Sequence, residues 1–210
     1  MNKINLIFDI DATLINTLDF NFNNHQVTDI GNIEDFKVGI INWASFLFLV
    51  FLRPYLPELL TFCYKNFNVG FWTAGHPLYC KEILKLILNE EQINLTNIIL
   101  ARDGTDYVNL KNNTTFNDIN KEDIKKPLES IWEDNNLMET FKPENTILID
   151  DNLKICCDNP LNSINIPRFD RFSKEDDVLL RLQYLLDFIK DLSDVRIIEK
   201  NINTYSSGNL

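Results

Sequence analysis

The stretch Phe8-Asp9-Ile10-Asp11-Ala12-Thr13-Leu14 decides the fold of this chain. The residues that lead into it are mostly apolar and favour extended backbone, which predicts a buried strand over 4–9. Asp9 and Asp11 are two positions apart, so both carboxylates point to the same side where the strand ends. Open α/β folds bind ligands at the carboxyl ends of their strands. Two such acids repel each other unless a proton or a cation relieves them, and Mg²⁺ prefers carboxylate oxygens.

Strand and helix patterns alternate along the rest of the chain. We expect buried strands at 68–73 and 146–150 and a short strand at 98–101. Apolar residues at helical spacing predict helices at 57–64, 78–88 and 178–192. Such alternation indicates a parallel α/β sheet with helices packed on it.

Three other segments lie between these expected strands and helices. The apolar run 43–52 is too short to cross a membrane, since a spanning helix needs about 20 apolar residues. It is interpreted as a buried strand, and an interfacial or partner-facing segment is the alternative. The polar stretch 13–36 is expected to form loop and short irregular structure, and 103–122 an exposed loop or small insertion.

The composition fits one globular domain, which we place at 1–198, followed by a polar tail at 199–210 that is expected to be disordered. The formal net charge of −11 argues against binding a nucleic-acid backbone, which needs a basic surface. The four cysteines lack the spacing of a disulfide framework or a zinc site, and no signal peptide is visible. An intracellular protein, nuclear or cytoplasmic, with no membrane partner is expected.

Polar residues follow three of the expected strands: Asp9 with Asp11, then Thr73, then Asp150 with Asp151. A single acid at a strand end is equally well explained as a helix cap or turn residue. Three such ends in order are harder to explain by capping, and their strands meet at one edge of a parallel sheet. The sequence therefore predicts a site in which these residues act together.

These motifs resemble those of the haloacid-dehalogenase superfamily of phosphotransferases. The segment 9–14 is similar to the first motif of that superfamily, 71–74 to its second and 149–152 to its fourth. More narrowly, the chain resembles the branch that dephosphorylates the C-terminal repeat of RNA polymerase II, called NLI-interacting-factor-like. The resemblance covers about 4–192 and implies a parallel sheet flanked by helices, with a small β-hairpin insertion and no large cap domain.

The narrower resemblance depends on three further features: Arg53-Pro54 before a helix, Arg102 after a Leu-rich strand, and a lysine followed one residue later by Leu128. That lysine is assigned to Lys126, with Lys125 as the alternative. The chain departs from the branch at Ala12, where the branch has Glu, and at Pro127, which replaces an acid. The pair Asp150-Asp151 is more similar to the larger members of the branch or to the wider superfamily than to the small members, which have Asp-Asn.

The resemblance implies a catalytic set of Asp9, Asp11, Thr73 and Lys126. Asp9 would attack phosphorus and form an aspartyl-phosphate that water then hydrolyses. Asp11 would be the general acid for the leaving alkoxide and later the base for water. Thr73 and Lys126 would contact the transferring oxygens. The simpler alternatives are a strand-end hydroxyl for Thr73 and a surface amine for Lys126.

The resemblance also implies a substrate-binding set of Thr13, Ala74 and Arg102, with a structural ion pair as the alternative for Arg102. The cofactor would be Mg²⁺, bound by four aspartates: Asp9, Asp11 (through its backbone carbonyl), Asp150 and Asp151.

The leading functional expectation is a Mg²⁺-dependent phosphoprotein phosphatase for phosphoserine or phosphothreonine, acting on a polymerase-tail-like peptide. Its partner would be the phosphorylated peptide or protein. One alternative is a phosphatase of small phosphometabolites or of nucleic-acid terminal phosphates. Another is a catalytically silent binding module on the same fold.

Overall fold

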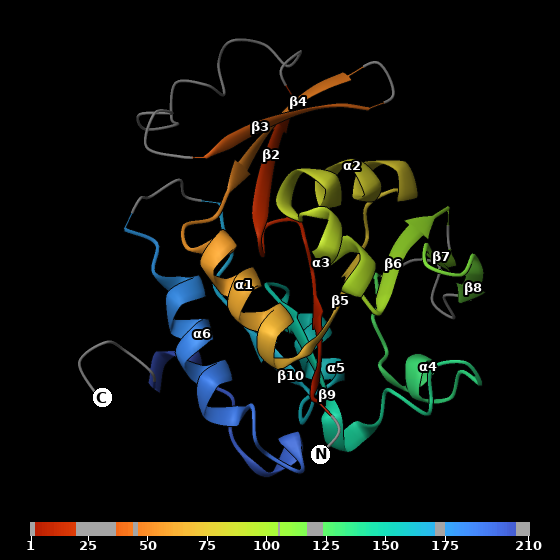
Figure 1. Ribbon diagram of the computed structural model, residues 1–210, viewed down its shortest axis with the longest axis vertical. Coiled ribbons are helices and arrows are strands. Elements are labelled where there is room, and N and C mark those ends of the chain that lie inside the picture. Colours follow the sequence, from red (N-terminus) through yellow and green to blue (C-terminus); the bar gives the residue numbers. More distant parts are fainter. Residues whose placement is uncertain are drawn as a thin grey trace.

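The computed structural model describes residues 3–19, 37–43, 46–104, 106–116, 124–170 and 175–204. Within these residues the main sheet has seven strands in the order β10-β9-β1-β5-β6-β7-β8 (Figure 1). Neighbouring strands from β10 to β6 are parallel, whereas β7 and β8 are antiparallel. The strands are β1 (Asn5–Phe8), β5 (Asn68–Thr73), β6 (Ile98–Asp103), β7 (Asp106–Asn109), β8 (Thr114–Phe116), β9 (Thr146–Asp150) and β10 (Ser163–Asn165).

Strand β1 runs between β5 and β9, and its register aligns the ends of the three strands. Phe8 is the partner of Phe71 in β5 and of Ile149 in β9. Asp9 therefore follows β1 at the level where Asp150 ends β9, and Thr73 ends β5 one residue further along. The predicted parallel α/β sheet is confirmed, and its register brings the predicted site residues to one edge.

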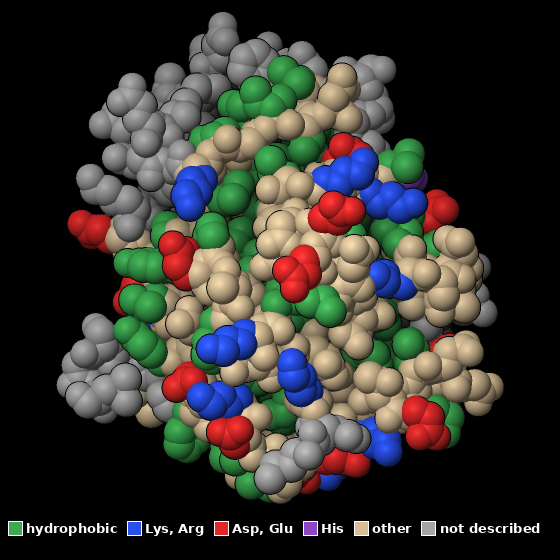
Figure 2. All heavy atoms as spheres, viewed as in Figure 1, with side chains coloured by type: hydrophobic (Ala, Val, Ile, Leu, Met, Phe, Trp, Pro, Cys, Tyr) green, Lys and Arg blue, Asp and Glu red, His purple; other side chains and the backbone are tan. Residues whose placement is uncertain are grey.

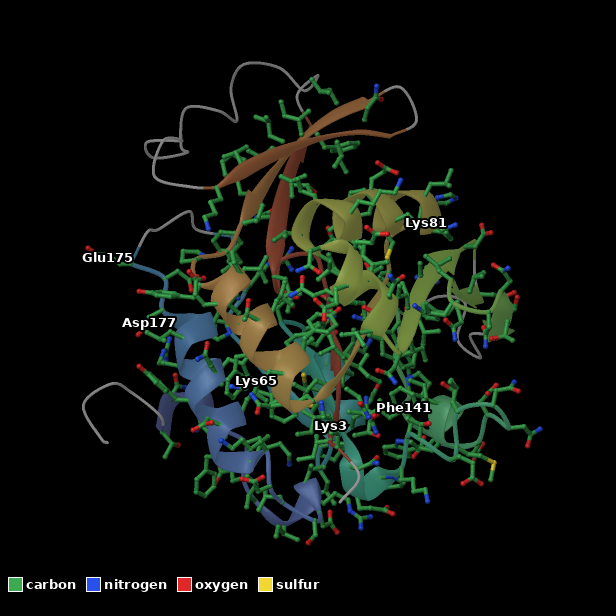
Figure 3. The ribbon with its side chains drawn as sticks, viewed as in Figure 1. Lys3, Lys65, Lys81, Phe141, Glu175 and Asp177 are labelled. Atoms are coloured by element: carbon green, nitrogen blue, oxygen red, sulfur yellow. The ribbon has the colours of Figure 1, made fainter. Side chains whose placement is uncertain are left out.

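Helices cover both faces of the main sheet because alternate residues of each strand point to opposite sides. Leu6 and Phe8 join a core cluster with α1, α2 and α6, whereas Ile7 joins a second cluster with α4 and α5. Lys3, just before β1, donates to the Lys65 carbonyl at the end of α1 (Figure 3). The helices are α1 (Leu56–Asn66), α2 (Pro77–Ile87), α3 (Glu90–Leu95), α4 (Glu129–Trp132), α5 (Leu153–Asp158) and α6 (Val178–Ile189).

A second sheet of three antiparallel strands lies above the main sheet in the view of Figure 1, in the order β2-β4-β3. It consists of β2 (Ile15–Asp19), β3 (Val38–Trp43) and β4 (Phe46–Leu52). This is the small insertion that the resemblance implied. No large cap domain is present among the described residues.

Two expectations about this region need correction. The segment 13–36 was expected to be irregular, yet β2 pairs residue by residue with β4 from Ile15 to Asp19. The run 43–52 was expected to be a buried strand, but in β4 only Val50 and Phe51 are buried among the residues with described side chains. A polar segment joins a sheet here because a distant apolar strand supplies its partner. Residues 20–36 lie outside the described part.

The stretch 103–122 was expected to be an exposed loop or small insertion, and its described part instead forms β7 and β8. These strands add an antiparallel edge to the main sheet. Tyr107 of β7 is buried and packs edge-on against Trp72, with ring centroids 5.4 Å apart. Residues 117–123 lie outside the described part.

Packed structure continues to residue 204 at the C-terminal end. The short 3-10 helices η4 (Val195–Ile197) and η5 (Ile202–Thr204) follow α6, and Ile202 is buried in the cluster that contains α6; a third 3-10 helix, η3 (Pro143–Asn145), precedes β9. The remainder of the predicted tail, 205–210, lies outside the described part. Among the described residues, no helix combines the length and the apolar character that a membrane span needs.

Acidic and basic side chains are interspersed on the face of the molecule shown in Figure 2. The lysines there lie among acidic groups, so this view shows no extended basic surface of the kind a nucleic-acid backbone needs.

Candidate active site

Lys126 lies between two carboxylates at the carboxyl edge of the main sheet. Its Nζ donates to Asp9 Oδ1 at 2.5 Å and to Asp150 Oδ2 at 2.7 Å. All three residues are buried, with 7% of Asp9, 2% of Lys126 and 1% of Asp150 exposed. The Asn159 side chain donates to the Lys126 carbonyl, which fixes the backbone of the segment before α4. One amine facing two carboxylates leaves this buried cluster short of positive charge, a costly state that a cation relieves.

The shortage of positive charge is reflected in the pKa values. Burial raises the pKa of Asp9 to about 7, and the charge of Asp150 acts in the same direction while Lys126 opposes it. Although burial works against the charged amine, the attraction of Asp9 and Asp150 raises the pKa of Lys126. The amine of Lys126 therefore stays protonated. The charge of Asp9 depends on whether a cation binds beside it.

Asp9, Asp150 and Asp151 form a group that fits a divalent cation. Each offers one carboxylate oxygen, and the three oxygens lie within 4.8 Å of one another. Carboxylates are the ligands that a hard ion such as Mg²⁺ prefers. The carboxylate of Asp11 does not belong to this group, and binding through its backbone carbonyl, which the resemblance implies, stays a prediction.

Thr13 holds Asp151 in this arrangement. Its hydroxyl donates to Asp151 Oδ1 at 3.1 Å and accepts from the Asp151 N–H at 3.1 Å. The other oxygen of Asp151 pairs with Arg168 Nη1 at 3.2 Å. Burial, followed by the charge of Asp150, raises the pKa of Asp151. Thr13 thus orients a candidate metal ligand, while its predicted contact with substrate stays a prediction.

Asp11 has a different environment from Asp9, although only one residue separates them. Tyr79 donates its hydroxyl to Asp11 Oδ1 at 2.5 Å, and Thr73 donates to Oδ2 at 3.3 Å. Burial raises the pKa of Asp11, and the hydrogen bonds from Tyr79 and Thr73 oppose that change. Burial and the neighbouring charge of Asp11 raise the pKa of the Tyr79 phenol, which therefore remains a donor. Asp9 and Asp11 therefore have different environments, which suit them to different roles.

The turn after Asp9 has an uncommon backbone conformation. Ala12 has φ 62°, in the left-handed region that a residue with a Cβ seldom adopts. The turn is closed by hydrogen bonds from the Leu14 N–H to the Ile10 carbonyl at 2.9 Å and from the Phe169 N–H to the Ala12 carbonyl at 2.7 Å. Backbone strain of this kind persists where the surroundings over-determine the conformation, and it often does so at functional sites.

Arg53 stabilises the backbone of this turn. Its guanidinium is buried, donates to the Thr13 carbonyl at 3.0 Å and pairs with Asp176 at 3.0 Å. It also lies 5.4 Å from the centroid of the Phe169 ring. These contacts assign Arg53 to positioning the turn that carries Asp11 and Thr13.

The structure distinguishes between the two lysines that the sequence left open. Lys125 is partly exposed and lies 3.9 Å from Asp158, whereas Lys126 enters the acid cluster. Arg102 is half-buried next to the site, since Ala101 is the partner of Thr73 and the Arg102 N–H donates to the Gly75 carbonyl at 3.0 Å. Ala74 is half-buried in the turn that follows Thr73. The substrate-binding roles of Ala74 and Arg102 stay predictions.

Tyr79 and Arg168 contact acids of the site and were missed by the sequence analysis; Tyr79 is the more deeply buried of the two. It lies in an amphipathic helix where an aromatic residue at core spacing is most simply explained by packing. The signal that was available is its place in the first turns of the helix that begins four residues after Thr73. A side chain there faces the end of the strand that carries the motif.

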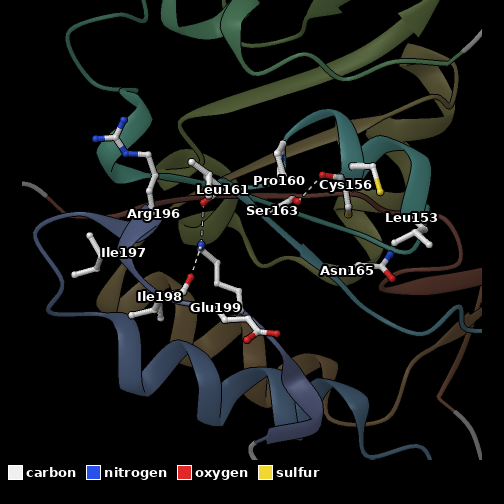
Figure 4. Close-up of a pocket in the computed structure, with 12 residues that line it drawn as sticks. Leu153, Cys156, Pro160, Leu161, Ser163, Asn165, Arg196, Ile197, Ile198 and Glu199 are labelled. Atoms are coloured by element: carbon white, nitrogen blue, oxygen red, sulfur yellow. Dashed lines mark hydrogen bonds between the residues drawn. The ribbon is translucent and has the colours of Figure 1, made fainter.

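A cavity of about 560 Å³ lies elsewhere, between α5, β10 and the segment around η4 (Figure 4). Lys200 crosses it and donates to the carbonyls of Leu161 at 2.8 Å and Ile198 at 3.2 Å. Its lining contains none of the acids described above. The chemistry therefore points to the acid cluster at the sheet edge as the candidate active site, and not to this cavity.

Comparisons with known proteins found a family model, several relatives and similar solved structures. The family model described as NLI interacting factor-like phosphatase matches residues 4–196. A CTD phosphatase-like protein, 355R, of Invertebrate iridescent virus 6 is 30% identical over 193 residues, which cover 87% of this chain and 97% of that protein. A ubiquitin-like domain-containing CTD phosphatase of Arabidopsis thaliana is 31% identical over 157 residues, which cover 70% of this chain and 42% of that protein.

Among solved structures, Fcp1, described as an essential RNA polymerase II CTD phosphatase, matches with a TM-score of 0.54 at 17% identity. The match covers 94% of this chain and 46% of the Fcp1 chain, so this protein spans a little under half of that length. A structure of fission yeast Fcp1-R271A bound to beryllium fluoride matches with the same TM-score at 16% identity. At these identities the likeness shows a shared fold.

Proposed function

The chain belongs to the NLI interacting factor-like phosphatase family, and on that premise we propose that it is a Mg²⁺-dependent phosphatase of phosphoserine or phosphothreonine in proteins. The observation that carries this proposal is the placement of Lys126 between Asp9 and Asp150, with Asp151 beside them. A carboxylate that attacks a phosphate dianion needs fixed positive charge at the point of approach. This cluster has one such charge and the ligands for another.

The proposed reaction has two steps. In the first, an oxygen of Asp9 bonds to phosphorus while the bond from phosphorus to the substrate oxygen breaks, and Asp11 gives that oxygen a proton. In the second, Asp11 takes a proton from water as the water oxygen attacks phosphorus and releases Asp9. Each step is easier than direct attack of water on the ester. Lys126 stays protonated throughout and offsets charge on the transferring oxygens.

Asp9, Asp150 and Asp151 would hold the Mg²⁺. The ion would supply positive charge for the phosphoryl oxygens and lower the pKa of Asp9. Because burial raises the pKa of Asp9 to about 7, part of this acid is protonated near neutral pH when no cation is bound. Asp9 would therefore be both the nucleophile and a ligand of the Mg²⁺, so binding of the ion would affect how much of the nucleophile is ionised.

A protein substrate is supported by two observations. The relatives named above are CTD phosphatases or resemble them. In addition, the described residues place only the small sheet β2-β4-β3 above the acids, where a large cap would restrict entry to small molecules. We therefore propose an extended phosphopeptide, such as a polymerase-tail-like segment, as the substrate.

The proposal is tested by measuring phosphate release from three substrates: a phosphoserine peptide, a sugar phosphate and a 3′-phosphorylated oligonucleotide. Each is assayed with Mg²⁺ and with EDTA. The wild type is compared with Asp9→Asn and with Asp158→Asn, an acid that faces Lys125 outside the cluster. We expect turnover of the peptide, dependence on Mg²⁺, loss in Asp9→Asn and normal rates in Asp158→Asn. Turnover of the other two substrates alone would refute the peptide assignment, and equal rates for wild type and Asp9→Asn would refute a nucleophilic Asp9.

A further inference from the structure

Tyr79 contacts a carboxylate of the site but has no part in the reaction described above. We infer that Tyr79 is a positioning residue that holds Asp11 in the orientation needed to protonate a poor leaving group. Through this contact the enzyme would be adapted to alkyl phosphate esters such as phosphoserine. The inference rests on the proposed function, because it requires Asp11 to be the general acid.

The hydrogen bonds of Asp11 assign different roles to its two oxygens. Tyr79 directs its hydroxyl to Oδ1 at 2.5 Å, while Thr73 faces Oδ2 at 3.3 Å. A phenol has a single hydrogen to donate, and the short contact commits it to Oδ1. Because Oδ1 accepts the shorter of the two hydrogen bonds, we place the hydrogen of a protonated Asp11 on Oδ2, where the contact with Thr73 is weaker. That fixes both the rotation of the carboxyl group and the oxygen from which the proton leaves.

Contacts from two strands of the insertion sheet hold the Tyr79 side chain in place. Tyr79 is 8% exposed, and its ring packs edge-on against Phe48 of β4 with the centroids 6.3 Å apart. Its hydroxyl also lies 3.4 Å from Thr17 Oγ1 of β2. The insertion sheet therefore supports the same phenol that bonds to Asp11 in the main domain.

Gly75 provides the space that this arrangement needs. A Cβ at position 75 would lie 2.9 Å from Tyr79 Cδ1 and 3.1 Å from Thr73 Oγ1. Real Cβ atoms essentially never approach other atoms as closely as the first of these distances. Any larger residue at this position would displace the ring, the Thr73 hydroxyl or both. Tyr79 and Thr73, the two donors to Asp11, both need the space that a side chain at position 75 would fill.

The effect of this contact depends on the leaving group. Breaking the ester bond of phosphoserine leaves an alkoxide, which needs a proton as it departs. Nitrophenolate is stable as an anion and needs none. General acid catalysis contributes roughly 10²- to 10⁴-fold where a proton is needed. A misoriented Asp11 should therefore slow phosphoserine cleavage and spare p-nitrophenyl phosphate.

The test compares kcat/KM of wild type and Tyr79→Phe on a phosphoserine peptide, phenyl phosphate and p-nitrophenyl phosphate, all with Mg²⁺. This parameter reports the step that breaks the ester bond. We expect a fall of about tenfold or more on the peptide and less than about threefold on p-nitrophenyl phosphate, since only the first needs the acid. Phenyl phosphate differs from the latter only by the nitro group and should fall between them. A general loss of folded structure would lower all three rates equally.

Tyr64→Phe is the matched control. The Tyr64 hydroxyl forms a 2.6 Å hydrogen bond with Thr96 Oγ1, so this variant also loses one partly buried phenol contact, but away from the acids. Its ratio of peptide to p-nitrophenyl phosphate activity should equal that of the wild type. Gly75→Ala is a second route to the same effect and should change the ratio in the same direction as Tyr79→Phe.

The outcomes separate this inference from the proposed function. Equal losses on all substrates, or no loss, in both Tyr79→Phe and Gly75→Ala would overturn the positioning role while wild-type activity upheld the phosphatase. A wild type inactive on all three substrates would overturn the proposed function and the inference with it. If Tyr79→Phe does not fold, an unchanged ratio of peptide to p-nitrophenyl phosphate activity in Gly75→Ala overturns the inference, because the added Cβ crowds both donors to Asp11.

Discussion

Replacing Lys126 by methionine should destabilise the protein and nearly abolish its activity. The side chain is 2% exposed and pairs with Asp9 at 2.5 Å and with Asp150 at 2.7 Å. Removing one partner of a buried ion pair typically costs about 3–5 kcal/mol, because the remaining charges stay buried without compensation. Removing one preorganised donor from a reaction centre typically lowers kcat about 10²- to 10³-fold. We expect effects of these sizes in Lys126→Met.

The destabilisation should also depend on pH. In the folded chain, burial raises the pKa of Asp9 from its ordinary value of 3.8 to about 7. Folding therefore favours the protonated acid, and that contribution is lost as the pH rises through about 7. Lys126 lowers the pKa of Asp9, so its removal raises that pKa further. Without Mg²⁺, Lys126→Met should lose more stability at about pH 8 than at about pH 5, because only the ionised Asp9 lacks compensation.

The assay is urea unfolding at both pH values without Mg²⁺, together with peptide dephosphorylation with Mg²⁺. Lys125→Met is the matched control, because Lys125 is partly exposed and only 3.9 Å from Asp158. An exposed pair of this kind contributes about 0–1 kcal/mol. The reasoning would be refuted if the two lysine variants lost similar stability and activity, or if Lys126→Met lost more stability relative to the wild type at about pH 5 than at about pH 8.

Three further predictions concern the parts around this cluster. Thr13→Val removes the hydroxyl that orients Asp151, so titration calorimetry should show Mg²⁺ binding weakened about 10- to 100-fold, and unchanged affinity would contradict that role. Mg²⁺ affinity of the wild type should rise as the pH increases through about 7, because the protonated Asp9 is a poor ligand. Calorimetric affinities that stay constant from about pH 6 to about pH 8 would exclude Asp9 as a ligand that must lose a proton. Arg53→Met leaves Asp176 without its buried partner and should lower the free energy of unfolding by about 3–5 kcal/mol, and a change below about 1 kcal/mol would show that the pair is dispensable.

The site residues that lie at strand ends could be predicted from the sequence, because local apolar patterns and the parallel arrangement of the strands were enough to place them. Asp9, Thr73 and Asp150 each follow an apolar run, and strands that run parallel in one sheet end at the same edge. Their meeting could therefore be predicted without knowing any contact. Lys126 came from the family resemblance alone, because a lysine in a polar segment carries no signal of burial.

The missed features depend on contacts between distant segments. Strand β2 is polar and gains its structure by pairing with β4, more than 25 residues later in the chain. Strands β7 and β8 are short and polar, and Tyr107 is buried in a cluster that contains Trp72 of the distant strand β5. Tyr79 fits helix packing equally well whether or not its hydroxyl reaches an acid. The direction of a hydroxyl is set by its neighbours in space, and sequence spacing does not encode it.

The central claim is that Asp9 becomes phosphorylated during turnover. It is tested most directly by quenching the enzyme in acid during turnover of p-nitrophenyl phosphate with Mg²⁺ and analysing its peptides by mass spectrometry. Asp11→Asn should accumulate the species because its release lacks a base. We predict a phosphoryl group on the peptide that contains Asp9, and none in Asp9→Asn. Rapid turnover by an enzyme whose Asp9 peptide is never modified, in the wild type or in Asp11→Asn, would contradict the account.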